Sequence, residues 1–150
     1  MINRTILKDL QEALAVFPVV LLCGARQVGK STLVLSLCEH YITLDDITQL
    51  DGARADPKRF IQDLPRPIVI DEIQKAPELL PAIKEEVDRK RKNGDFLLTG
   101  SANLLGYKKV TESLAGRMGV MELLPLSCRE MANRADANLA DDLFFCRMAK

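Results

Sequence analysis

The sequence is poor in the residues that build metal centres and disulfide frameworks. Its 150 residues include no tryptophan, one histidine and four cysteines, Cys23, Cys38, Cys128 and Cys146. The cysteines form no Cys-x-x-Cys pair and have no histidine at ligand spacing, which argues against a zinc site and against a secreted disulfide framework. We therefore expect a reducing, cytoplasmic location.

The chain also lacks an excess of charge of either sign. It has 21 basic and 21 acidic residues, so no overall field attracts nucleic acid or an anionic membrane. The basic run at residues 89–92 falls in the last turn of a predicted helix, where cations complement the helix dipole, and no aromatic residues interrupt it. A nucleic-acid partner is therefore not indicated.

Long apolar runs are absent as well. No run approaches the roughly 20 residues that are needed to span a bilayer. Residues 13–23 contain Pro18, and we interpret them as a helix end and a buried strand rather than as a signal peptide. We expect a soluble protein with no membrane partner, whose length suits a single domain.

Short apolar runs do occur, and they alternate with helical patterns. The runs are residues 19–23, 41–44, 68–70, 96–98 and 120–123. This alternation is the signature of an α/β fold with a parallel sheet covered by helices on both faces. Helices are predicted at residues 30–38, after the cap formed by Asp56 and Pro57, and from Pro81 up to Asn93-Gly94.

The strongest motif is GARQVGKS at residues 24–31, which matches GxxxxGK(S/T) between an apolar strand and an apolar helix. In such a phosphate-binding loop, backbone N–H groups wrap the polyphosphate, and glycines allow the close approach. We expect Lys30 to place its charge on the β and γ phosphates, Ser31 to ligate Mg²⁺ and Thr32 to add a phosphate contact. The predicted nucleotide-binding set is Gly24, Ala25, Arg26, Gln27, Val28, Gly29, Lys30, Ser31 and Thr32.

Two acids follow the third apolar run, in IVIDEIQ. A carboxylate at the carboxyl end of a parallel strand faces the crevice where ligands bind in open α/β sheets. Asp71 is therefore predicted to hold Mg²⁺, directly or through water. Glu72 is predicted to orient and deprotonate the water that attacks the γ phosphate. The alternative is that the two acids only cap the following turn.

Polar residues at the end of the fourth strand are candidates for a sensor between the γ phosphate and the water. Thr99 and Ser101 are favoured over Asn103, although a polar turn or helix cap is an equal alternative for each. Arg117, just before the fifth strand, is the candidate arginine finger, with a surface ion pair as the equal alternative. For Asp45 and Asp46 a turn role is favoured, because their strand is expected at the sheet edge.

These segments together resemble the AAA-type P-loop ATPase module of bacteria and archaea that precedes a C-terminal domain of unknown function. The likeness rests on GARQVGKST, IVIDEIQKAPELLPAIK, FLLTGSANLL and ESLAGR…ELLPLS, and it covers roughly residues 2 to 130. It implies a three-layer fold with strand order 5-1-4-3-2, ATP with Mg²⁺, and the roles assigned to Lys30, Ser31, Asp71 and Glu72. It also allows self-association and a protein partner for the C-terminal region.

The resemblance divides the chain into an ATPase core at residues 1–126 and the start of a truncated helical segment at residues 127–150. The predicted function is Mg-dependent hydrolysis of the ATP β–γ bond, which drives a conformational change, and the shortened C-terminal part makes efficient turnover doubtful. A nucleotide-gated switch with little hydrolysis is the main alternative. A P-loop small-molecule kinase is less favoured, because no arginine-rich lid stands out. A GTPase is weakest, because residues 133–136 only mimic its base-reading motif.

Overall fold

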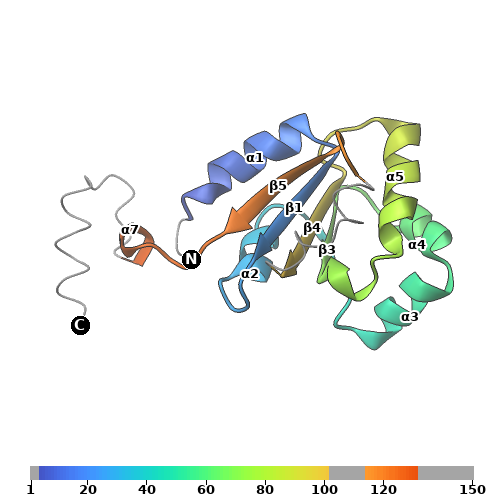
Figure 1. The fold of residues 1–150 in the computed structure, drawn as a ribbon, viewed down its shortest axis with the longest axis horizontal. Helices are drawn as coiled ribbons and strands as arrows, with labels where there is room; N and C mark the ends of the chain where they lie inside the picture. Colours follow the sequence, from blue (N-terminus) through green and yellow to red (C-terminus); the bar gives the residue numbers. More distant parts are fainter. Residues whose placement is uncertain (1–3, 102–113, 132–150) are drawn as a thin grey trace.

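A five-stranded parallel sheet forms the centre of the molecule (Figure 1). The computed structural model describes residues 4–101 and 114–131. The sheet order is β2-β3-β4-β1-β5, and every pairing is parallel. The order is the predicted 5-1-4-3-2 read from the other edge, so the fold prediction is confirmed. The strands are β1 (Val19–Gly24), β2 (His40–Thr43), β3 (Ile68–Asp71), β4 (Phe96–Ser101) and β5 (Met118–Leu123).

Helices cover both faces of this sheet, which gives three layers (Figure 1). One face packs against α1 and α2, and the opposite face packs against α3, α4 and α5. The helices are α1 (Ile6–Val16), α2 (Lys30–Val34), α3 (Ile47–Ala55), α4 (Pro57–Asp63), the 3-10 helix η1 (Ile73–Lys75), α5 (Leu79–Lys90) and α7 (Cys128–Met131). In residues 4–101 and 114–131, none of the helices is long and apolar enough to cross a membrane.

Alternation along β1 explains how one strand supports two cores. Val19 and Leu21 belong to the core under α5, whereas Val20 and Leu22 belong to the core under α1 and α2. All four side chains are fully buried. Because successive strand residues point to opposite faces, a continuous apolar run fills both layers. Each such side chain contributes roughly 1.5 to 3 kcal/mol of burial free energy.

The helix predicted at residues 30–38 is wrong in its second half, because α2 ends at Val34. The Ser36 hydroxyl donates to the Leu33 carbonyl at 2.6 Å, and the Ser36 and Leu37 amides bond three residues back rather than four. A serine that competes for a helix carbonyl favours such a tightened end. Leu35 is consequently 54% exposed instead of buried.

Two other predicted helix boundaries can be compared directly. The Asp56 side chain accepts a bond from the Arg59 amide at 3.0 Å, with Pro57 opening α4, as the sequence predicted. Helix α5 begins at Leu79, two residues before Pro81. Proline is tolerated there because a first-turn amide has no partner within the helix. The division at residue 126 stays a prediction, since α7 is short and residues 132–150 lie outside the described residues.

Arg4 joins the start of the described chain to its end. Its guanidinium donates to the Glu130 carboxylate at 3.1 Å, to the Val28 carbonyl at 2.8 Å and to the Leu124 carbonyl at 2.6 Å. Glu130 also accepts bonds from the backbone amides of Thr5 and Ser127. The Arg4 side chain therefore links the residues before α1 to the loop after β1 by a hydrogen bond and to α7 by an ion pair.

Replacing Glu130 with glutamine is expected to destabilise the protein at neutral pH but hardly at all near pH 2. Burial alone would raise the pKa of Glu130, but bonds from the Ser127 and Thr5 amides and from Arg4 lower it to about 2, against the usual 4.5. A depressed folded-state pKa stabilises the protein above pH 4.5, and this contribution is lost as the pH falls toward 2. The expected loss on substitution is roughly 2 to 3 kcal/mol at pH 7.

Urea unfolding of the parent and of Glu130→Gln at several pH values from 7 down to 2.5 measures this difference. Glu12→Gln is the matched control, because the Glu12 ion pair with Lys8 is solvent-exposed and contributes little. A Glu130→Gln penalty that stays constant over this pH range would contradict the assignment.

Candidate functional site

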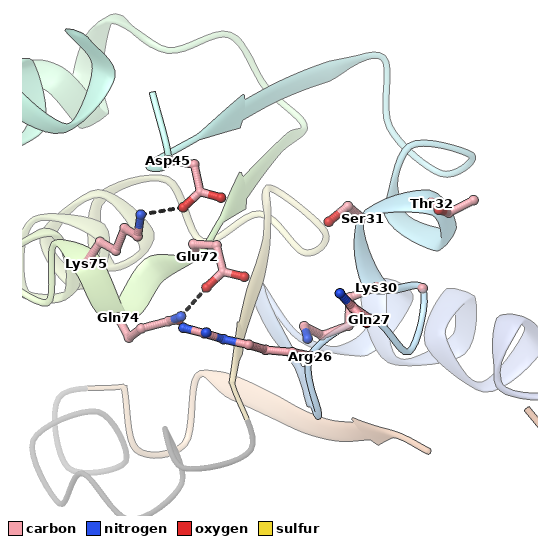
Figure 2. Close-up of a pocket in the computed structure, with 10 residues that line it drawn as sticks. Arg26, Gln27, Lys30, Ser31, Thr32, Asp45, Glu72, Gln74 and Lys75 are labelled. Atoms are coloured by element: carbon pink, nitrogen blue, oxygen red, sulfur yellow. Dashed lines mark hydrogen bonds and ion pairs between the residues drawn. The ribbon is translucent and has the colours of Figure 1, made fainter. Parts of the chain in front are cut away.

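An open pocket of about 770 Å³ lies at the carboxyl ends of the central strands. The loop after β1 forms one side, and the residues that follow β3 form the other (Figure 2). Parallel strands bring these segments together because all their carboxyl ends meet at one edge of the sheet. The pocket is lined by Arg26, Gln27, Gly29, Lys30, Ser31, Thr32, Asp45, Glu72, Gln74 and Lys75.

The glycines of the loop occupy positions that other residues would strain. Gly29 has φ 92°, in the left-handed region, and directly precedes α2. At Gly24 an added Cβ would lie 2.5 Å from the Leu123 carbonyl oxygen of β5. Gly24 therefore lets the chain leave β1 close to β5, and Gly29 provides the left-handed residue that precedes α2.

Lys30 holds its ammonium group inside the loop. The residue is 7% exposed, and Nζ donates to the Gly24 carbonyl at 3.0 Å and to the Ala25 carbonyl at 2.7 Å. A buried cation must be paired or hydrogen-bonded, and two neutral carbonyls leave its full positive charge uncompensated. An anion in the pocket could therefore replace these two carbonyls as the partner of the Lys30 ammonium with little change in the loop.

Asp71 receives three hydroxyl groups. The Ser31 hydroxyl donates to Oδ2 at 3.0 Å, the Tyr41 hydroxyl donates to the same oxygen at 2.6 Å, and the Thr99 hydroxyl donates to Oδ1. The carboxyl group is almost fully buried, at 4% exposure of the residue. Three neutral donors satisfy its oxygens without neutralising its charge, so the site can still attract a cation.

Tyr41 is a member of this site that the sequence analysis missed. The register pairs Tyr41 with Val69, and Asp71 lies on the same face of β3 two residues further on. A tyrosine is long enough to reach this diagonal neighbour across parallel strands. Burial, together with the bond donated to Asp71, raises the pKa of Tyr41 to about 12. Only the register would have revealed the contact, because no local motif marks it.

Glu72 directs its carboxylate into the pocket from a strained backbone position (Figure 2). Its φ of 61° and ψ of 44° are left-handed, which costs a non-glycine residue roughly 1 to 3 kcal/mol. The Glu72 amide donates to the Thr99 hydroxyl at 3.2 Å, and the Glu72 carboxylate accepts from the Gln74 amide. Thr99 therefore contacts both acids, through the Asp71 carboxylate and the Glu72 amide. The Glu72 side chain makes no capping bond to η1, so the two acids do not simply cap that turn.

The remaining predicted residues differ in their relation to the pocket. Arg26, Gln27 and Thr32 line the pocket, whereas Ala25 and Val28 contribute backbone carbonyls to Lys30 and Arg4. Ser101 ends β4 beside Gly24 and does not line the pocket. The sensor candidate Asn103 lies outside the described residues.

Arg117 precedes β5 and therefore lies at the amino edge of the sheet, away from the pocket of its own chain. Its guanidinium donates to the Asp88 carboxylate of α5 through two nitrogens. The surface ion pair, one of the two predicted alternatives, is thus present. Contact with a nucleotide would require the pocket of a neighbouring copy.

Asp45 and Asp46 separate in the structure. Asp46 caps α3 by accepting from the Thr48 amide at 2.8 Å, which agrees with the predicted turn role. For Asp45 the favoured turn role is incomplete, because the residue lines the pocket and forms an ion pair with Lys75. An edge strand still ends at the same sheet edge as its parallel neighbour, and this brings Asp45 to the site.

Comparisons with known proteins agree with this geometry. A family model described as AAA domain matches residues 16–132. Two uncharacterized proteins, Mb2031c of Mycobacterium bovis and Rv2008c of Mycobacterium tuberculosis, are each 40% identical over 131 residues. The matched region covers 84% of this chain and 29% of each relative, so the chain spans less than a third of their length.

Proposed function

The chain belongs to the AAA domain family, an ATPase-like nucleotide-binding module, and on that ground we propose that it binds Mg-ATP and hydrolyses the β–γ bond. One observation carries the proposal. The buried Lys30, the Ser31 hydroxyl and the Glu72 carboxylate line one open pocket, and Ser31 bonds the buried Asp71 carboxylate. Phosphoryl transfer needs a positive charge beside the phosphates, ligands for a metal ion and a group that orients the attacking water, and these residues can supply all three.

Binding would use the loop and Lys30. The ammonium would exchange the Gly24 and Ala25 carbonyls for β- and γ-phosphate oxygens, and these charge-assisted bonds are roughly twice as strong as neutral ones. Loop N–H groups would bind the remaining phosphate oxygens. The oxygen donors of Ser31 and Asp71, 3.0 Å apart, fit Mg²⁺. When bound, Mg²⁺ neutralises phosphate charge that develops during transfer.

Hydrolysis would use Glu72 as the general base. Its carboxylate takes one proton from a water, and the water oxygen forms a bond to the γ phosphorus. The bond between that phosphorus and the β–γ bridging oxygen breaks, so ADP and inorganic phosphate leave. The position of Glu72 beside the loop residues supports this assignment (Figure 2).

Removing magnesium is expected to reduce the stabilisation of the protein by ATP. ATP at a hundredfold excess over its Kd should add about 2.7 kcal/mol to the free energy of unfolding, and EDTA should remove a large part of this gain. Thermal melts with ATP, with ATP plus Mg²⁺ and with ATP plus EDTA measure the effect. Melts without nucleotide control for a direct effect of EDTA, and an ATP shift that EDTA leaves unchanged would refute the metal assignment.

A nucleotide-gated switch with little turnover is the second candidate, and the Arg4 contacts favour it specifically. Arg4 joins the Val28 carbonyl in the loop to Glu130 at the start of α7. A change in loop conformation on binding would therefore strain a contact to the C-terminal side of the core. The proposal has two further parts. In a self-assembled state, Arg117 would reach the nucleotide of a neighbouring copy. A protein partner would bind the C-terminal region.

A further inference from the structure

We propose that Gln74 is a positioning residue that aims the Glu72 carboxylate, and with it the attacking water, at the γ phosphate. This inference rests on the proposed hydrolysis. Gln74 lines the same pocket, and its side-chain amide donates to Glu72 Oε2 (Figure 2). Without this bond nothing in the described contacts fixes the Glu72 carboxylate, because the other bonds of Glu72 involve its backbone.

The backbone under this pair is rigid. The Glu72 amide bonds the Thr99 hydroxyl, and the Glu72 carbonyl accepts from the Lys75 amide at 3.0 Å, which closes η1. Ile73 and Ala76, on either side of Gln74, are buried in the core. Both ends of the Glu72–Gln74 contact therefore start from fixed Cα positions, and the amide–carboxylate bond decides where the carboxylate points.

The second polar atom of Gln74 is also significant. Gln74 Oε1 is buried and has no hydrogen-bond partner among the described residues. Because this oxygen is enclosed by protein atoms, the nitrogen is the end of the side-chain amide that meets the Glu72 carboxylate. Gln74 therefore acts on the attacking water through the Glu72 carboxylate.

The test is Gln74→Met, which keeps the length of the side chain and removes both polar atoms. We expect about a tenfold loss in kcat for phosphate release, because misplacing a reacting group costs rate rather than ground-state binding. The Kd for Mg-ATP and the melting temperature should match those of the parent. Gln62→Met, at an exposed glutamine of α4, is the matched control and should change neither quantity.

A double-mutant cycle separates positioning from a merely structural role. If Gln74 acts through Glu72, adding Gln74→Met to Glu72→Gln should cause no further loss in single-turnover hydrolysis. Full parental turnover in Gln74→Met, or an equal loss with and without Glu72, would overturn the inference alone. A parent that binds Mg-ATP without hydrolysing it would overturn the proposed hydrolysis and this inference together.

Discussion

Glu72→Gln is expected to lower the rate of ATP turnover by at least ~10²-fold, which is the lower end for a positioned general base. Glutamine keeps the size of the side chain and can still bond Gln74, but it cannot take a proton from water. The proposed metal-binding acid, Asp71, is left in place by this substitution with its three hydroxyl donors. The loss should therefore fall on kcat, while the Kd for Mg-ATP stays unchanged.

Phosphate release at saturating Mg-ATP gives the rate, and isothermal titration gives the affinity. Glu85→Gln is a suitable control, because Glu85 is exposed on α5 and pairs with Lys58 outside the pocket. Normal hydrolysis by Glu72→Gln would show that Glu72 is not the base. A parent that binds Mg-ATP but shows no turnover would instead favour the switch.

Lys30→Ala should weaken ATP binding roughly 10- to 100-fold, since hydrogen bonds to charged groups contribute about 1.5 to 3 kcal/mol. The fold should survive, because the lysine ammonium bonds only two carbonyls of its own loop. The residue therefore ties no distant segments together. Titration with a fluorescent ATP analogue measures the affinity, and a melting curve measures the fold.

Lys58→Ala provides the comparison, because it removes the same side chain from an exposed position on α4. It should leave ATP affinity as it was. An unchanged affinity in Lys30→Ala would remove the phosphate-binding assignment of the loop. Unfolding of Lys30→Ala would show that the lysine has a structural role that its contacts do not reveal.

The parts of the site that sequence predicts are those encoded within a few consecutive residues. The loop at residues 24–31 needs its glycines and Lys30 at fixed spacing, so the motif alone places the lysine beside the loop carbonyls. The acidic pair follows a buried strand, and strand polarity is enough to bring it to the same edge. The strand order followed from the family resemblance and is confirmed.

The parts that sequence misses depend on register and on competition between local bonds. Tyr41 reaches Asp71 only because β2 and β3 align it with Val69. Asp45 reaches the pocket through an edge strand, which the sequence reasoning discounted. The early end of α2 depends on which group takes the Leu33 carbonyl, and a periodic apolar pattern contains no information on that competition.

The Arg4 contacts also impose an order on how the protein is completed during synthesis. Arg4 leaves the ribosome before Glu130, which lies 126 residues later in the chain. At typical elongation rates the partner carboxylate arrives roughly 6 to 25 s after the arginine. During that interval Arg4 can donate to the Val28 carbonyl, but the Glu130 carboxylate that holds the Arg4 guanidinium in place has not yet been made. The loop after β1 thus obtains its full set of supporting contacts only after residues far along the chain have been made.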